Sequence, residues 1–296
     1  MTAANSGLRT PDRRAVAPHD VNRPLRIASA PKQDLGIGPS YQAHFAAMQR
    51  QRRIRSFVLR AGRTTLAQER ALAELWPAYG IDLKDTALDL EAIFGRCAPR
   101  CLEIGFGVGE VIGTLAKNHP HIDYLGIEVH RSGIGRLLLR AQSDALKNLR
   151  IICEDAADVL RHHVQDESFD EVLVFFPDPW HKKRHHKRRL IDAQFIAMVA
   201  AKLRCGGILR LATDWQAYAE QMLAVCNANS HLQSLSQDRT YVARPDFRPA
   251  TRFERRGARL GHGTWDLAYS KSRKCEAAAN ALDDELNGQC GENHAG

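Results

Sequence analysis

The sequence lacks the features that mark a membrane protein, a secreted protein or a structural metal site. Its 296 residues contain no apolar run approaching the roughly 20 residues of a membrane span, and the N-terminus has arginines but no hydrophobic segment of the kind found in secretory signals. The seven cysteines form no CxxC pair, and Cys97 and Cys101 are too isolated from other ligands to indicate zinc. An odd number of cysteines without framework spacing is typical of reduced thiols, so we expect a cytoplasmic protein.

Positive charge, in contrast, is in excess. Lysine and arginine number 42 against 34 acidic residues, a formal net charge of +8. A basic balance favours a polyanionic partner, although many basic proteins bind none. The length and the 44% hydrophobic content allow one large domain or two small ones. We predict a basic, disordered arm at residues 1–53, one globular domain at residues 54–270 and a polar tail at residues 271–296.

Predicted strands and helices alternate through the globular part of the sequence. The predicted strands are residues 101–104, 123–129, 148–154, 172–176 and 207–213, and the helices that follow them are 111–117, 132–145, 156–164, 190–203 and 215–226. A helix at 66–75 precedes this series, and a closing strand is expected at 263–269. Such alternation is typical of βαβ units, so the predicted fold class is α/β, with a doubly wound, mostly parallel, Rossmann-like sheet.

Acidic residues mark the ends of the first four predicted strands. Glu103 lies just before a glycine turn at 105–109, and Glu128 ends the second strand. Asp155 follows the third strand and Asp178 the fourth. Ligands of open α/β sheets bind outside the carboxyl ends of the strands, so these four acids are predicted to line one ligand site. The alternatives are a satisfied buried carboxylate at Glu103, solvated loop acids, and a helix cap at Asp155.

The type of ligand follows from the glycine spacing and from the acids together. The turn reads GxGxG rather than the dinucleotide pattern GxGxxG, and glycine turns alone are weak indicators. Glu128 suits the ribose hydroxyls of either kind of adenosine cofactor. Glu103 and Asp155 would repel a pyrophosphate, whereas S-adenosylmethionine has no phosphate and carries an ammonium and a sulfonium. These residues therefore favour a methyl donor, with a dinucleotide or a purely structural turn left as alternatives.

A stiff acidic turn and a cationic run follow the fourth predicted strand. Two prolines flank Asp178, and each fixes φ and keeps its predecessor extended. Trp180 then either stacks on a base or walls the pocket, or it is a core residue that closes the turn. The run at 182–189 contains six lysines and arginines, and its place at the ligand edge of the sheet favours RNA over a merely solvated face. Because these cations disfavour a divalent ion, we expect no metal at the neighbouring histidines.

At these residues the chain resembles the bacterial tRNA (guanine-N7)-methyltransferases. The matching segments are residues 103–107, 126–130, 176–182, 212–215, 251–254 and 259–263, within a resemblance that runs from about residue 54 to 269. The segments at 176–182 and 212–215 are much more specific than the glycine turn. The resemblance implies a seven-stranded class I methyltransferase fold with an antiparallel last strand. It also implies S-adenosylmethionine as the methyl donor and N7 of a guanine in the tRNA variable loop, guanine 46 in the family convention, as the acceptor.

The resemblance also implies roles for particular residues. Asp178 would be the catalytic residue, and the donor would be bound by Glu103, Glu128, Asp155 and Asp178. Substrate contacts would come from Lys182, Asp214, Thr251, Arg252, Phe253 and Glu254, and RNA contacts from Arg184, His185, His186, Lys187, Arg188 and Arg189. The family usually has lysine where this chain has Arg252, and the two side chains differ in geometry. Asp214 precedes a predicted helix, so a capping role is its alternative.

Three other functions compete with this interpretation. The chain could methylate another RNA or a small molecule, or it could be an RNA-binding protein without catalysis, although the intact acids argue against the latter. An NAD-dependent dehydrogenase is the weakest alternative, because the turn is not suited to a phosphate. The expected partner is tRNA, with no membrane contact. The sequence does not determine the oligomeric state, for which a monomer is the expectation.

Overall fold

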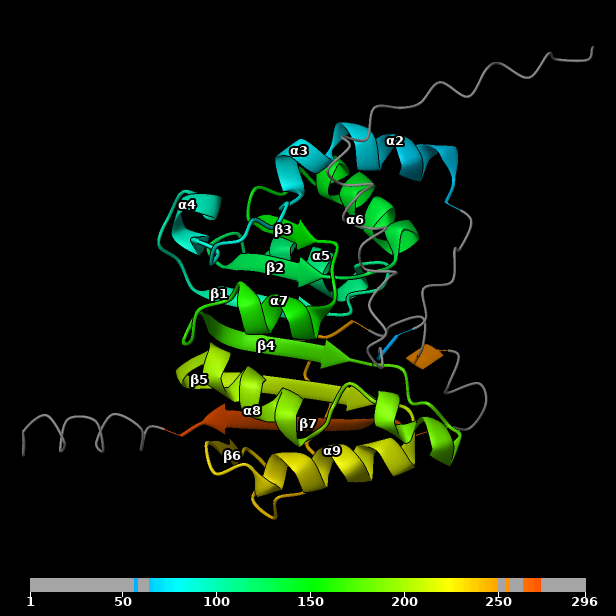
Figure 1. The fold of residues 1–296 in the computed structure, drawn as a ribbon, viewed down its shortest axis with the longest axis vertical. Helices are drawn as coiled ribbons and strands as arrows, with labels where there is room; N and C mark the ends of the chain where they lie inside the picture. Colours follow the sequence, from blue (N-terminus) through cyan, green and yellow to red (C-terminus); the bar gives the residue numbers. More distant parts are fainter. Residues whose placement is uncertain (1–55, 58–63, 250–253, 256–262, 273–296) are drawn as a thin grey trace, which may run out of the picture. The chain divides into compact units, whose positions relative to one another are not determined.

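A computed structural model describes residues 56–57, 64–249, 254–255 and 263–272 (Figure 1). All of them belong to one compact unit. The predicted arm at 1–53 lies outside the described residues, as do Thr251, Arg252, Phe253 and the predicted tail beyond residue 272.

Within the described residues, seven strands form one sheet in the order β3-β2-β1-β4-β5-β7-β6. The strands are β1 (Arg100–Ile104), β2 (Asp123–Ile127), β3 (Leu149–Ile152), β4 (Phe169–Phe175), β5 (Leu203–Thr213), β6 (Leu232–Ser234) and β7 (Trp265–Lys271). Neighbours from β3 to β5 are parallel, whereas β7 is antiparallel to both β5 and β6. The predicted α/β fold with a mostly parallel, seven-stranded sheet is confirmed. Strand order reverses between β1 and β4, which creates the kind of switch point where such sheets bind ligands.

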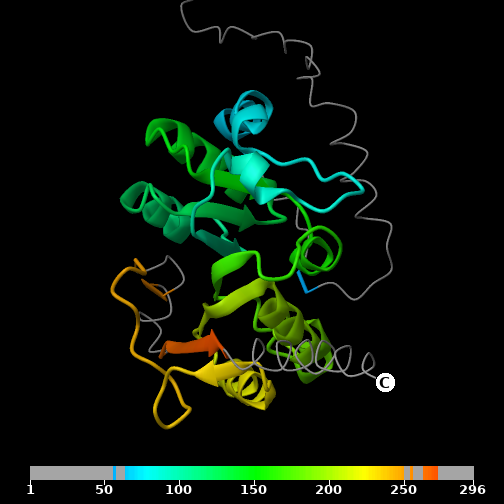
Figure 2. The same cartoon turned by 90° about the vertical axis from the view of Figure 1, so that its left-hand side faces the viewer.

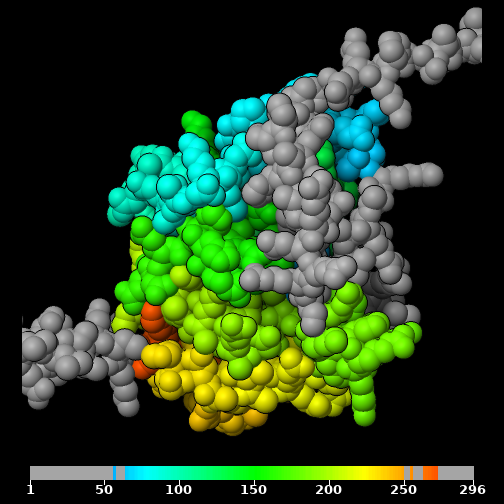
Figure 3. Space-filling model, viewed as in Figure 1, coloured from blue at the N-terminus to red at the C-terminus, as the bar shows by residue number. Residues whose placement is uncertain are grey.

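Helices cover both faces of this sheet. Successive side chains of each strand point to opposite faces, so a strand contributes side chains to the layers on both sides. The helices are α2 (Leu66–Glu74), α3 (Trp76–Tyr79), α4 (Leu90–Phe94), α5 (Glu110–Asn118), α6 (Arg131–Ser143), α7 (Ala156–His162), α8 (Ala193–Lys202) and α9 (Gln216–Ala228). Figure 2 shows α5 and α6 on one side of the sheet and α7 and α8 on the other. In Figure 3 the side chains of α7, α8 and α9 form a continuous surface over the near face.

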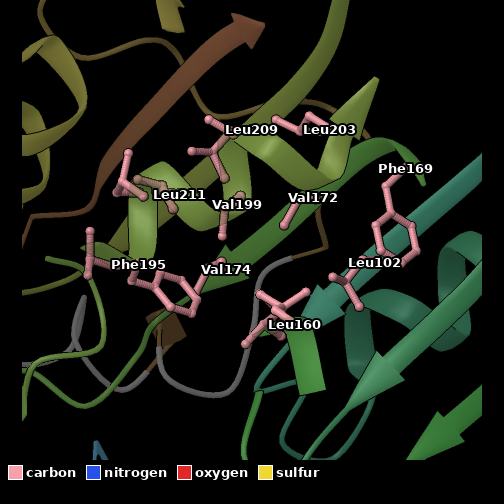
Figure 4. Close-up of a cluster of buried hydrophobic side chains, with 14 of the residues drawn as sticks. Leu102, Leu160, Phe169, Val172, Val174, Phe195, Val199, Leu203, Leu209 and Leu211 are labelled. Atoms are coloured by element: carbon pink, nitrogen blue, oxygen red, sulfur yellow. The ribbon is translucent and has the colours of Figure 1, made fainter. Parts of the chain in front are cut away.

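Two separate hydrophobic clusters fill the layers between helices and sheet. Leu102 of β1 packs in one cluster with Leu160 of α7 and Phe195 of α8 (Figure 4). Its neighbour Cys101 belongs to the other cluster, with side chains of α5 and α6 such as Ile112. All five residues of β1 are buried, as expected for a central parallel strand covered on both sides.

Several element boundaries differ from the sequence predictions, and two of the differences have a clear physical reason. β4 begins at Phe169 rather than at residue 172, because the acids Asp170 and Glu171 pair with arginines of β5 and so tolerate a strand position that an apolar pattern misses. The helix predicted from residue 190 begins after Asp192, whose Oδ1 accepts a hydrogen bond from the backbone N–H of Phe195 at 2.8 Å. β6 is only three residues long and was not predicted.

Candidate functional site

A cavity of about 900 Å³ lies at the carboxyl ends of β1 to β4. The four acids singled out in the sequence, Glu103, Glu128, Asp155 and Asp178, all line it. Two further acids, Glu110 and Glu154, also line it, together with Ser56, Phe57 and the aromatic pair Phe175 and Phe176. The strand ends therefore form one shared acidic cleft rather than separate surfaces.

The glycine turn between β1 and α5 forms the floor of this cavity. Gly105, Gly107 and Gly109 have φ values of 70°, 58° and 75°, a left-handed conformation in which a side chain is strained. At Gly105 and Gly107 the turn therefore presents bare backbone to the cavity, which leaves room for a ligand to approach closely.

Glu128 holds the glycine turn against the end of β2. Its Oε2 accepts a hydrogen bond from the backbone N–H of Gly107 at 2.7 Å, and its Oε1 accepts from the N–H groups of Val129 at 2.7 Å and His130 at 3.0 Å. The side chain is buried, so the solvated-loop alternative is wrong for this acid. Because a carboxylate oxygen has two lone pairs, Oε2 keeps acceptor capacity for a ligand hydroxyl.

Glu103 is buried and only partly satisfied. Its Oε2 has no hydrogen-bond partner in the described part of the chain, so the alternative of a fully satisfied buried carboxylate does not hold. Desolvation raises the pKa of Glu103 to about 8, with a further contribution from the charge of Glu128 and an opposing hydrogen bond from the backbone N–H of Ile112. A cationic group in the cavity would favour the ionised form and satisfy Oε2.

The end of β3 contributes two adjacent acids, of which the sequence analysis identified one. Asp155 caps α7, since its Oδ1 accepts from the backbone N–H of Ala157 at 2.9 Å, and it lines the cavity as well. The capping alternative and the cavity position therefore coexist in one residue. Glu154 was missed, although its place at a strand end was the available signal. Burial, with the charges of Asp155 and Asp158, raises the pKa of Glu154 to about 8.

The turn that carries Asp178 is bounded by two residues in unusual backbone conformations. Phe176 has φ 53° and Trp180 has φ 47°, and positive φ values are outliers for bulky side chains. Each such residue costs about 1–3 kcal/mol and persists only where surrounding contacts hold it. One such contact is the hydrogen bond from the N–H of Phe176 to the carbonyl of Ala212 at 2.8 Å. Asp178, between the two prolines, is exposed at the cavity.

Asp214 and Lys182 lie beyond the cavity lining. Phe175 pairs with Ala212 in the sheet, so Asp214 stands at the end of the strand next to the Asp178 turn. The cap of α9 is Trp215, with no side-chain hydrogen bond, so the capping alternative for Asp214 is wrong. In the part of the chain that the structure describes, neither the carboxylate of Asp214 nor the ammonium of Lys182 has a hydrogen bond or ion pair.

The cationic run forms a 3₁₀ helix, η1, at Lys183–Arg188. Its exposed or half-buried cations and histidines are available to a phosphate, but Arg189, which follows, is buried. The Nε of Arg189 donates to the carbonyl of Pro179 at 2.9 Å, and its Nη1 donates to Oε1 of Gln221 at 2.7 Å. Arg189 thus holds the loop onto the domain.

Trp180 packs against its own loop. Arg188 lies over its ring at 4.7 Å, and the ring of His185 meets it edge-on at 5.7 Å. Its Nε1 donates to the carbonyl of Ser56 at 2.9 Å. Trp180 is not among the residues that line the cavity, so these contacts favour the packing alternative over a wall of the pocket.

A buried ion cluster, which no sequence motif indicated, lies behind the aromatic pair of the cavity. Arg248 is fully buried, and its guanidinium lies 2.7 Å from Oε2 of Glu254 and 2.9 Å from Oδ2 of Asp266. Its Cζ is 5.3 Å from the ring centres of both Phe175 and Phe176. Glu254, one of the predicted substrate residues, is therefore bound to Arg248. The next residue, Arg255, reaches the cavity lining through an ion pair with Glu110 at 3.2 Å.

Among the described residues, no group of three or more His, Cys, Asp and Glu side chains could hold a metal ion. None of the described helices is long and apolar enough to cross a bilayer.

The strand order, the antiparallel β7 and the acidic cavity at the switch point together define a class I methyltransferase. A family model described as "Putative methyltransferase" matches residues 97–267. A tRNA (guanine-N(7)-)-methyltransferase of Sodalis glossinidius is 51% identical over 236 residues, which cover 80% of this chain and 98% of that protein. The enzyme of the same name from Pseudomonas aeruginosa is 51% identical over 74% of this chain and 90% of its own length. The chain therefore belongs to the tRNA (guanine-N7)-methyltransferase family, as the sequence motifs predicted.

Among solved structures, the 16S rRNA methyltransferase KamB is 15% identical, with a TM-score of 0.48, and the match covers 66% of this chain and 98% of that one.

Proposed function

We propose that this chain transfers the methyl group of S-adenosylmethionine to N7 of a guanine in the variable loop of tRNA, guanine 46 in the family convention. The observation that carries the proposal is the gathering of Glu103, Glu128, Asp155 and Asp178 in one cavity of about 900 Å³, in a chain about half identical to curated enzymes of that name. The size is within the range of sites for small ligands.

The residues of the cavity fit the charge of the methyl donor. The unpartnered Oε2 of Glu103 offers a buried acceptor to a cationic group, and Oε2 of Glu128 can accept from a ribose hydroxyl while it holds Gly107. The ionised carboxylates among the acids of the cavity would repel a pyrophosphate, which disfavours a dinucleotide. When bound, the donor supplies a methyl group on a positively charged sulfur.

Methyl transfer to guanine N7 depends on the positioning of the reactants more than on proton transfer. Guanine N7 has a lone pair and no proton, so attack requires no general base. Positive charge moves from donor to purine and is not newly created, so the stabilisation needed is smaller than in acyl transfer. The reacting atoms must instead be held in line at about 3 Å. In this proposal Asp178 and Asp214 accept hydrogen bonds from the guanine N1–H and N2–H₂ edge, or Asp178 accepts from the ammonium of the donor, and either contact orients the reactants.

In this proposal the tRNA binds to the cationic run at residues 182–188. Lys182, Arg184, Lys187 and Arg188 would contact phosphates, together with His185 and His186, and such contacts position an RNA without reading its sequence. Desolvation and the neighbouring cations lower the pKa of His185 from its usual value. The predictions of a monomer and of a cytoplasmic location remain predictions.

The test is radiolabelled methyl transfer to two tRNAs that differ only in one variable-loop base. One carries guanine and the other 7-deazaguanine, which lacks the acceptor nitrogen. We expect label in the first and background in the second. Equal labelling of the two tRNAs would contradict N7 as the acceptor atom. If neither tRNA is labelled while calorimetry still shows S-adenosylmethionine binding, the acceptor is a different molecule.

A further inference from the structure

Trp180 lies between the cationic loop and the wall of the cavity. On one side, Arg188 and His185 of η1 contact its ring. On the other, its indole N–H donates to the carbonyl of Ser56, 124 residues away in the sequence. Ser56 and Phe57 line the cavity that would hold the methyl donor. One side chain thus touches both an RNA-binding candidate and a donor-binding candidate.

The contact with the indole leaves the hydrogen-bond donors of Arg188 available. Its Cζ lies 4.7 Å from the centre of the ring, and a guanidinium has five N–H donors. Within the described residues, the Arg188 side chain has the indole contact but no hydrogen bond or ion pair. An arginine already ordered in this way loses less conformational freedom when it binds a phosphate. The indole therefore prepares Arg188 for an anion.

The contact with Ser56 fixes part of the cavity wall. The backbone that carries the indole is itself held, because the carbonyl of the preceding Pro179 accepts a hydrogen bond from Nε of the buried Arg189 at 2.9 Å. The hydrogen bond to the Ser56 carbonyl, at 2.9 Å, then sets where the Ser56–Phe57 backbone lies against the cavity. Loss of this bond lowers the fraction of molecules with the wall in place, and the apparent donor affinity falls by that fraction.

We propose that Trp180 is a positioning residue with two separable roles: its N–H holds Ser56–Phe57 at the donor cavity, and its ring orders Arg188 for a phosphate of the RNA. The second role rests on the proposed function, whereas the first requires only that the cavity binds the donor.

The two roles can be separated by substitution. Trp180→Phe keeps an aromatic ring for Arg188 but removes the donor to Ser56, and Trp180→Leu removes both. Arg188→Gln removes the phosphate contact and leaves the indole N–H. The matched control is Trp76→Phe, which deletes an indole hydrogen bond of the same length, 2.9 Å to Oδ1 of Asp82, on α3 outside the cavity lining.

The experiment measures two dissociation constants for each variant, after thermal melts establish folding. One is for S-adenosylhomocysteine without RNA, by calorimetry, and the other is for unmodified tRNA without donor, by filter binding over a salt series. We expect Trp180→Phe to weaken the binding of S-adenosylhomocysteine about three- to tenfold, the effect of one hydrogen bond. Its affinity for tRNA should stay within about twofold of the wild-type value. Trp180→Leu should weaken both kinds of binding. Arg188→Gln should weaken only tRNA binding, with a salt slope shallower by about one. Trp76→Phe should change neither dissociation constant.

Two results would overturn the proposal. Unchanged donor affinity in Trp180→Phe would remove the first role, and tRNA binding by Trp180→Leu as tight as that of the wild type would remove the second. If Trp180→Leu fails to fold, Trp180→Phe still tests the first role, and the second is tested by Arg188→Gln, whose unchanged salt slope would refute it. Wild-type protein that binds donor but not tRNA would count against the proposed function and not against the first role.

Discussion

The donor side and the acceptor side of the cavity are built in different ways. On the donor side, Glu103, Glu128 and Asp155 stand at or next to the ends of β1, β2 and β3, whose pairing brings these ends together. On the acceptor side, Asp178 lies in a turn between two residues with positive φ. That turn is supported from behind by Arg248, whose Cζ lies 5.3 Å from the ring centre of Phe176.

The two sides of the cavity therefore differ in the contacts that determine their geometry. Backbone hydrogen bonds of the sheet bring together the strand ends that carry the donor-side acids, so the positions of these acids depend little on side-chain contacts outside the cavity. Side-chain clusters that join distant segments fix the acceptor side, so substitutions outside the cavity should act on it.

The largest expected effect is the loss of the cation behind the acceptor side. Arg248→Met removes the buried cation that pairs with both Glu254 and Asp266, and removing one member of a buried ionic cluster costs about 3–5 kcal/mol of the unfolding free energy. Urea denaturation measures it. The control is Arg210→Met, whose pair with Glu171 is partly exposed and should contribute about 1 kcal/mol or less. Equal losses in the two variants would contradict a supporting role for the buried cluster.

The next effect concerns Asp178 itself. Asp178→Asn keeps the shape of the side chain but removes its charge and one acceptor, so the reactants lose their orientation. We expect the transfer rate to fall about 100-fold, the order of magnitude for a small misplacement of reacting groups, with an unchanged melting temperature because the side chain is exposed. Single-turnover methyl transfer to tRNA measures the rate. Near-normal turnover in a folded variant would refute the catalytic role.

The difference between strand-end residues and side-chain clusters also explains how much of the site could be predicted from the sequence. The four acids at strand ends were predictable, because alternating strands and helices define a parallel sheet whose carboxyl ends share one edge. The burial of Arg189 among exposed cations was not, since the run 182–189 has no periodicity that distinguishes an inward from an outward side chain. Arg248 was missed for a related reason: its partners Glu254 and Asp266 are 6 and 18 residues away, in segments that only the folded chain brings together.

Glu103 gives a pH test of the donor side. Its pKa is raised from 4.5 to about 8 in the folded protein, so between these values the folded state keeps a proton that the unfolded chain has lost. Its contribution therefore lowers stability as pH rises through this window, by about 1.4 kcal/mol per pH unit, and levels off above about 8. Glu103→Gln should remove that slope, while the slope from Glu154 remains. Urea denaturation between about pH 5 and pH 8 measures it, and an identical slope in both proteins would show that Glu103 is ionised throughout.

The smallest expected effect distinguishes the two roles of Asp155. Asparagine caps a helix about as well as aspartate, so Asp155→Asn should change the unfolding free energy by less than about 0.5 kcal/mol. The lost charge should still weaken binding of the cationic S-adenosylmethionine, by about fivefold, equivalent to about 1 kcal/mol. Asp155→Ala, which cannot accept from the N–H of Ala157, should in addition lose about 1 kcal/mol of stability. Calorimetry and urea denaturation of the pair measure both quantities. If Asp155→Asn binds the donor as tightly as the wild type, Asp155 serves α7 alone, and the donor side consists of Glu103, Glu128 and Glu154.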